Sequence, residues 1–170
     1  MKNIFWSLLF SVVLFGCLKD PDSTQQCNYA DTQIQVPDSQ VQKLTAYLDS
    51  NHIHAQKHSS GFYYTIHSPG AGASVVNLCS VITVTYKGKF TNGTTFDSTA
   101  TNKTATFELG GVILGWQKGI PLISEGGSIT LYIPPALGYG PDDIQNNQGQ
   151  VVIPGNSILI FDVDILDISG

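Results

Sequence analysis

Hydrophobic and polar positions alternate over most of the chain beyond residue 61. Apolar side chains recur at every second position, the period of a β-strand with one buried face, over residues 62–66, 82–86, 105–109, 129–133 and 159–165. Residues 112–123 are instead apolar on almost every side and are long enough for a short helix. Because a helix of this kind must be enclosed, we expect the sheet to curl around it. The pattern predicts an α+β domain over residues 61–170.

A different period precedes this domain. Over residues 38–60, apolar side chains return at helical spacing, at Val41, Leu44, Tyr47 and Leu48. Asp38 or Ser39 can cap the start of such a helix. We therefore predict an N-terminal helical segment ahead of the sheet.

Three histidines crowd where this helical segment ends, namely His52, His54 and His58. No carboxylate or thiolate with metal-ligand spacing accompanies them, so we interpret them as solvated loop side chains. The sequence predicts neither a metal site nor a cofactor.

The first 16 residues have the pattern of an export signal. A lysine at position 2 is followed by an apolar run over residues 4–15, which is too short to span a bilayer. Leu14-Phe15-Gly16-Cys17 resembles a bacterial lipobox, in which the cysteine is acylated and becomes the first residue of the mature chain. We predict a lipoprotein signal peptide over residues 1–16 and a lipid anchor on Cys17. The alternative is an ordinary signal peptide with an incidental cysteine.

Residues 17–37 are polar and predict a flexible tether between the anchor and the folded part. The protein is then expected to be exported and lipid-anchored to a bacterial membrane, the outer membrane by preference, on its periplasmic or surface face. With Cys17 acylated, two cysteines remain, Cys27 and Cys79. They predict a disulfide in an oxidising compartment, and the alternative is two unpaired thiols.

Composition excludes two classes of protein. Hydrophobic residues make up 42% of the 170 residues and charged residues only 12%, so a core can form and disorder of the whole chain is excluded. The formal net charge is −5 and the sequence contains no arginine. Since arginine is the main side chain for gripping phosphates and reading guanine, no nucleic-acid partner is expected.

Seven short phrases occur in one order along the strand-rich part: VTYKG at 84–88, TFDS at 95–98, FELG at 107–110, VILGW at 112–116, LGYG at 137–140, VIP at 152–154 and LIFDV at 159–163. In these phrases the chain resembles the FKBP-type peptidyl-prolyl cis–trans isomerases, in the form found as exported bacterial lipoproteins. The resemblance implies a twisted antiparallel β-sheet wrapped around a short α-helix.

The same resemblance implies a pocket. Trp116 would form its floor, and Tyr86, Phe96 and Asp97 would serve catalysis together with Tyr139, whose hydroxyl would hold a substrate carbonyl. The backbone N–H of Ile113 would hold another carbonyl. The other substrate-binding side chains implied are Val112, Ile113, Phe107, Ile153 and Phe161.

The function implied is rotation about X-Pro bonds in proline-containing segments of unfolded or exported proteins, with a macrolide as a further ligand. Two departures from the family pattern keep an alternative open. Ala105 is small where the family commonly has an aromatic residue, and residues 141–151 form a longer and more polar segment, expected to be a flap over the pocket. The alternative is a lipid-anchored binding module or chaperone that has the fold without turnover.

Overall fold

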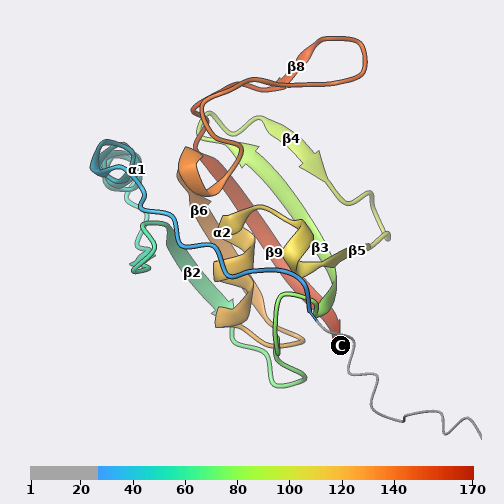
Figure 1. Cartoon of the computed structure of the whole chain (residues 1–170). Coiled ribbons are helices and arrows are strands. Elements are labelled where there is room, and N and C mark those ends of the chain that lie inside the picture. The colour runs from blue at the N-terminus through green and yellow to red at the C-terminus, as the bar shows by residue number, and fades with distance from the viewer. Residues whose placement is uncertain (1–26) are drawn as a thin grey trace, which may run out of the picture.

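A curled antiparallel sheet forms the body of the molecule, which is a computed structural model that describes residues 27–170 (Figure 1). Seven strands pair in the order β1-β2-β6-β9-β3-β4, and β5 pairs with β3 beside β4. Two further strands, β7 and β8, form a separate hairpin. The strands are β1 (Gln56–Lys57), β2 (Tyr63–Ser68), β3 (Val81–Phe90), β4 (Thr95–Ser98), β5 (Ala105–Glu108), β6 (Ser128–Ile133), β7 (Ile144–Gln145), β8 (Val151–Ile153) and β9 (Leu159–Ser169). All the pairs are antiparallel, as expected.

The helical elements are short apart from the first. They are α1 (Asp38–Ser50), α2 (Leu114–Gly119) and three 3-10 turns, η1 (Leu109–Gly111), η2 (Ile120–Leu122) and η3 (Pro135–Leu137). Figure 1 shows α2 lying across the concave face of the sheet, with α1 at the opposite edge from β4. The expected arrangement of a short helix enclosed by a twisted sheet is confirmed.

Close approach between α2 and the sheet depends on two glycines one helical turn apart. A Cβ at Gly115 would lie 2.5 Å from the Ile133 side chain, and one at Gly119 would lie 2.6 Å from Leu131. Both distances are too short for a real contact, so α2 presents bare backbone to β6. Trp116 and Ile120, on the same helical stretch, are buried in the main core. The helix can therefore sit inside the sheet without forcing it open.

The outer face of the sheet is covered at one end by α1. Leu44 and Leu48 of this helix are buried against Tyr132 of β6 and Ile160 of β9, as a second and smaller core. Ile160 lies on the opposite face of β9 from Leu159 and Phe161, which are in the main core, and it is buried because α1 covers that face. The N-terminal helix is thus packed on the domain.

Several boundaries differ from the sequence expectation. The helix α1 begins at Asp38 with Pro37 in the cap position and no side-chain cap, so capping by Asp38 or Ser39 is wrong: the Pro37 carbonyl accepts the N–H groups of Gln40 and Val41 and starts the turn itself. The helix ends at Ser50, as expected from a segment whose residues 51–60 end the helix, and these residues form loop and β1.

The enclosed helix is also shorter than the predicted 112–123. Pro121 has no N–H to donate to the turn before it, and the chain tightens into η2 at Ile120. Leu109, predicted at the end of a strand, is fully buried in η1 instead. The chain turns away from the sheet there because β5 ends its pairing with β3 at Glu108.

Residues 27–36, which we call the strap, lie against the domain, although the sequence placed them in a flexible tether. Cys27 is joined to Cys79 by a disulfide with a Cα–Cα distance of 5.6 Å. At the other end of the strap, Val36 is buried in the main core. The strap crosses α2 on its exposed side (Figure 1). The predicted signal peptide, Cys17 and the first part of the predicted tether lie outside the described residues.

Within residues 27–170 no helix is both long enough and apolar enough to cross a bilayer.

We predict that Leu44→Ala lowers the free energy of unfolding by about 3 kcal/mol, because it removes a fully buried side chain and leaves a cavity between α1 and the sheet. Urea denaturation measures the change. The matched control is Lys43→Ala, at an exposed position of the same helix, which is expected to stay close to the wild type. Equal midpoints for Leu44→Ala and wild type would mean that α1 is not packed on the domain in solution.

Candidate active site

Aromatic side chains from five elements converge inside the curl of the sheet. Trp116 of α2 lies at the centre, with ring-centroid distances of 5.3 Å to Phe161 of β9, 5.5 Å to Tyr86 of β3 and 5.9 Å to Phe107 of β5. All three rings meet the indole nearly at right angles, which is a favourable aromatic geometry. Phe96 of β4 extends the cluster through Phe161, at 5.5 Å. The structure thus brings these predicted pocket residues together.

Gly88 makes room for this cluster. A Cβ at this position in β3 would lie 2.6 Å from the Phe96 ring and 2.9 Å from the Phe161 ring. The two rings can therefore cross the backbone of β3, where any side chain would displace them. Phe90, two residues further along β3, packs against Phe96 with a ring-centroid distance of 4.8 Å and an interplanar angle of 37°. Sequence analysis did not identify the role of either residue; the glycine in an otherwise alternating strand was the available signal.

The environment of Trp116 is apolar. The side chain is 3% exposed, and its Nε1 is buried without a hydrogen-bond partner among the described residues. Since a buried N–H normally finds an acceptor, its isolation shows that the base of the cluster offers rings rather than polar atoms. A ligand resting on the indole would be held by apolar contact.

Polar groups lie at one side of the cluster. The Tyr86 hydroxyl donates a hydrogen bond of 2.6 Å to Oδ2 of Asp97, whose side chain is exposed. Burial raises the pKa of Tyr86, and the hydrogen bond and charge of Asp97 raise it further. Burial also raises the pKa of Tyr139, with a second contribution from the charge of Asp97. Both hydroxyls, like those of ordinary tyrosines, are protonated at neutral pH, and the Tyr86 hydroxyl donates its hydrogen bond to Asp97.

Tyr139 follows η3 and is 41% exposed. No hydrogen bond between residues of the described part of the chain uses its hydroxyl. It is the rim donor that remains available to a ligand. Ile153, at the end of β8, is buried in the main core and anchors the base of the β7–β8 hairpin. This hairpin, which contains most of the predicted flap 141–151, projects beyond the end of the sheet (Figure 1).

Val112 and Ile113 connect η1 to α2 and pack, partly buried, against the same core. Ile113 stands directly before α2, and its carbonyl accepts the N–H of Trp116 at 2.9 Å. Because the first N–H groups of a helix have no partner within it, the N–H of Ile113 is not needed by α2. Gln117 holds the connection from behind, as its Nε2 donates to the carbonyls of Val112 and Gly110 at 2.7 and 3.1 Å. Sequence analysis did not identify Gln117.

The three histidines near α1 do not form a cluster with other ligands. His58 stacks on Phe62 at 4.5 Å, and burial lowers its pKa, with a smaller effect from the charge of Lys118. Among residues 27–170 no group of three or more histidine, cysteine, aspartate or glutamate side chains is arranged to hold a metal ion.

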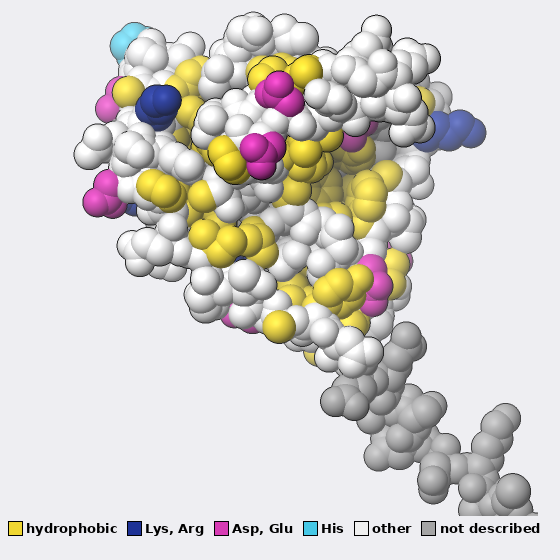
Figure 2. All heavy atoms as spheres, turned by 45° about the horizontal axis from the view of Figure 1, so that its top comes forward, with side chains coloured by type: hydrophobic (Ala, Val, Ile, Leu, Met, Phe, Trp, Pro, Cys, Tyr) yellow, Lys and Arg dark blue, Asp and Glu magenta, His cyan; other side chains and the backbone are white. Residues whose placement is uncertain are grey.

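Taken together, the site is an apolar socket of rings with a carboxylate, a free tyrosine hydroxyl and a helix-start N–H around it. Hydrophobic side chains gather around a hollow on the face turned forward in Figure 2. Such a site suits a non-covalent class of protein, one that holds a small apolar ring and orients the polar backbone on either side of it.

The comparisons with known proteins agree with this class. A model of the FKBP-type peptidyl-prolyl cis-trans isomerases matches residues 73–166. The chain therefore belongs to the FKBP-type peptidyl-prolyl cis–trans isomerase family, as its sequence phrases implied.

Two curated relatives illustrate the similarity. The FkpA isomerase of Buchnera aphidicola subsp. Schizaphis graminum is 49% identical over 115 residues, which cover 67% of this chain and 43% of the relative. FkpA of Escherichia coli K12 is 39% identical over 111 residues, covering 65% of this chain and 38% of the relative. The chain thus spans less than half the length of these relatives.

Solved structures give the same result. The crystal structure of FkpA from Escherichia coli matches with a TM-score of 0.65 at 33% identity, covering 78% of this chain and 60% of that one. The crystal structure of AtFKBP13 matches with a TM-score of 0.61 at 34% identity, covering 68% of this chain and 99% of that one.

We predict that the free energy of unfolding falls as the pH rises above about 10, since Tyr86 keeps its proton in the folded state where the unfolded chain releases it. The stabilisation that Tyr86 contributes is complete at pH values below the pKa of an unfolded tyrosine. It is lost as the pH rises toward the raised pKa of Tyr86 in the folded state. Urea denaturation at several alkaline pH values measures the slope. Tyr86→Phe is expected to make the decline shallower, and Asp97→Asn, which leaves the burial in place, to give an intermediate slope. Identical slopes in all three proteins would contradict the assignment.

Proposed function

We propose that this protein catalyses cis–trans isomerisation of X-Pro peptide bonds and so assists the folding of exported proteins. The observation that carries the proposal is the convergence of Tyr86, Phe107 and Phe161 on a buried Trp116, beside the Asp97 carboxylate and the Tyr139 hydroxyl. In the proposed complex the prolyl ring rests on the indole, and Phe96, Val112, Ile113 and Ile153 complete the walls.

The chemistry needs no covalent step. Resonance gives the peptide C–N bond partial double-bond character, and the rotation barrier is about 18–20 kcal/mol. At the top of the barrier the amide is twisted, the resonance is lost and the carbonyl is less polar. An apolar socket therefore favours the twisted amide over the planar one, which is preferential binding of the transition state. Each 1.36 kcal/mol of that preference raises the rate about tenfold.

The polar groups orient the substrate in this proposal. The Tyr139 hydroxyl and the Ile113 N–H each donate a hydrogen bond to a substrate carbonyl, so that one side of the X-Pro bond is fixed while the other turns. Oδ2 of Asp97 accepts a hydrogen bond of 2.6 Å from the Tyr86 hydroxyl and so holds the Tyr86 ring edge-on to Trp116. A macrolide is expected to compete with the substrate, because it would occupy the same rings.

Export and a lipid anchor form part of the proposal. The apolar run 4–15 followed by Leu14-Phe15-Gly16-Cys17 supports a lipoprotein signal peptide, with Cys17 acylated and the protein held on a bacterial membrane. The Cys27–Cys79 disulfide supports an oxidising compartment such as the periplasm or the cell surface. The substrates are then proline-containing segments of other exported chains.

We predict that the wild-type protein accelerates the proline-limited refolding of a test protein, and that Asp97→Ala or Tyr139→Phe lowers kcat/KM about tenfold, the effect of losing one hydrogen bond of ordinary strength. Matched controls are Asp164→Ala, on the outer face of the sheet, and Tyr64→Phe, whose hydroxyl donates to Gln56 instead. Both controls are expected to keep the wild-type rate.

The same assay distinguishes the isomerase from the alternative function, a binding module without turnover. Ala105 and the long β7–β8 hairpin, whose Val151 and Val152 are exposed, are the features that favour it. Trp116 is the only tryptophan among residues 27–170, so its fluorescence reports ligand binding independently of catalysis. Binding of an unfolded proline-containing chain with no acceleration above buffer would replace the isomerase by the binding module.

We predict that the protein incorporates labelled fatty acid when expressed from its full gene in a bacterial host, and that Cys17→Ala abolishes the incorporation. A Cys27→Ala variant is the control and is expected to retain the label, because this cysteine is in the folded part. Labelling that survives in Cys17→Ala would overturn the lipid anchor.

A further inference from the structure

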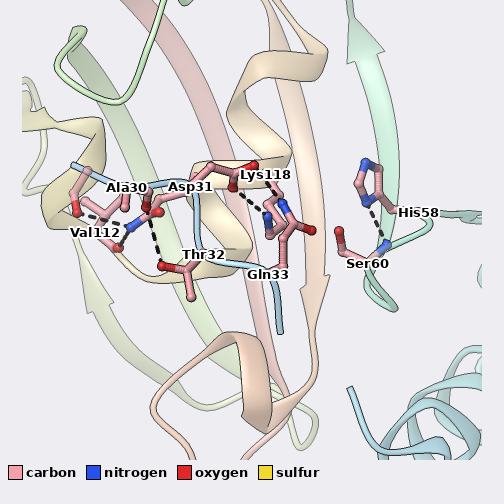
Figure 3. A network of polar contacts seen from close by, with 10 residues as sticks. Ala30, Asp31, Thr32, Gln33, His58, Ser60, Val112 and Lys118 are labelled. Carbon is pink, nitrogen blue, oxygen red and sulfur yellow. Dashed lines mark hydrogen bonds and ion pairs between the residues drawn. The ribbon is translucent and has the colours of Figure 1, made fainter. Parts of the chain in front are cut away.

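The strap is fixed at both ends and in its middle. The Cys27–Cys79 disulfide holds its first residue, and Val36 at its last residue is buried in the main core. In between, Asp31 pairs with Nζ of Lys118 of α2 at 3.1 Å, a contact drawn in Figure 3. The Lys118 side chain is 11% exposed and the Asp31 side chain 70% exposed, so the strap lies over Lys118 while Asp31 faces solvent. The strap therefore follows a defined path over α2.

Tyr29 of the strap covers the start of η1. A Cβ built on Gly110 would collide with the Tyr29 ring, so the ring lies directly on the Gly110 backbone. The Tyr29 hydroxyl donates a hydrogen bond of 3.2 Å to Oε2 of Glu108, the residue before η1. Tyr29 thus spans the first part of the connection that ends at Val112 and Ile113.

The segment around Cys79 holds η1 from the other side. The carbonyl of Leu78 accepts the N–H of Gly110 at 2.6 Å, and the carbonyl of Ser80 accepts the N–H of Leu109 at 2.9 Å. These two residues flank Cys79, whose sulfur is bonded to the first residue of the strap. One covalent bond therefore links the two segments that contact η1.

The contacts of Tyr29, Leu78 and Ser80 with η1 matter because most of η1 is glycine. Two of its three residues, Gly110 and Gly111, are glycines, which have more backbone freedom than any other residue. The connection leads within two residues to the Ile113 N–H at the edge of the socket. Gln117 donates hydrogen bonds to the carbonyls of Gly110 and Val112, at 3.1 and 2.7 Å.

We propose that Tyr29 is a positioning residue for the active site, and that the disulfide-closed strap clamps η1 so that the Ile113 N–H keeps its place at the edge of the socket. The inference rests on the proposed isomerase function for its kinetic consequence only. A carbonyl held by Ile113 is held before and during rotation of the X-Pro bond. Loosening the clamp therefore weakens substrate and transition-state binding together, which raises KM and changes kcat little.

The test compares three variants of the full chain in the isomerase assay. Tyr29→Ala removes the ring from Gly110 and is expected to raise KM about fivefold at nearly constant kcat. Tyr29→Phe keeps the ring and loses only the hydroxyl, so it is expected to restore most of the wild-type KM. Gln33→Ala is the control on the same strap, because its side chain contacts Asp31 and not η1.

The disulfide is tested in the same way. Reduction of the wild type, or Cys27→Ser, is expected to raise KM as Tyr29→Ala does, since it frees the end of the strap next to Tyr29. Because both changes release one clamp, the double variant Cys27→Ser/Tyr29→Ala is expected to be no worse than either single variant. Additive effects would mean that the disulfide and Tyr29 act separately, which would overturn the clamp.

A readout independent of activity is amide hydrogen exchange over residues 109–113. Exchange is expected to speed up in Tyr29→Ala and in the reduced wild type, while exchange in β9 is unchanged. Unchanged exchange at 109–113 in both would overturn the inference, whatever the kinetics. If the wild type shows no isomerase activity but exchange responds as expected, the proposed function fails and the clamp stands. The reduced wild type serves in place of any variant that does not fold.

Discussion

The enclosure of α2 by the concave face of the sheet is the contact on which the remaining structure depends. It requires a helix that is bare on one side, where Gly115 and Gly119 meet β6, and aromatic close by, where Trp116 meets Tyr86 and Phe161. A substitution that separates helix and sheet would remove the core and the socket together. The same packing contacts between α2 and the sheet therefore determine both the stability of the fold and the shape of the site.

The socket combines an apolar base with polar groups at its side. Within residues 27–170 the Nε1 of Trp116 has no hydrogen-bond partner, and Asp97 binds the hydroxyl of Tyr86, whose ring packs against the indole. This separation matters for isomerisation, because a polar base would stabilise the planar amide as well as the twisted one. Burial also raises the pKa of Tyr86 and of Tyr139. Membership of the FKBP-type family is consistent with such a site.

The edge of the socket is built differently from its base. The rings come from strands and a helix that the core holds, whereas Val112 and Ile113 follow a glycine-rich turn that depends on contacts from outside. In this chain those contacts come from Gln117 on α2 and from the strap, which the Cys27–Cys79 disulfide closes. A segment that precedes the family domain in the sequence is therefore part of the support of its site in our proposal.

The alternation of apolar residues predicted β2, β3, β5, β6 and β9, and the all-round apolar run predicted an enclosed helix, because both follow from local period and burial. The short strands β1, β7 and β8 were not predicted from the sequence. The seven sequence phrases indicated the family, and that resemblance implied that Trp116, Tyr86 and Asp97 lie in one pocket. Local patterns could not show that Leu109 leaves the strand or that polar residues 27–36 pack on the domain, although Pro121 is a local signal for the end of α2. Gly88 and Tyr29 gain their roles from partners distant in the sequence, Phe161 for Gly88 and Gly110 for Tyr29, whereas Gln117 binds the carbonyls of Gly110 and Val112 just before its own helix. Only the folded chain decides these, since each depends on which surfaces meet rather than on the character of one segment.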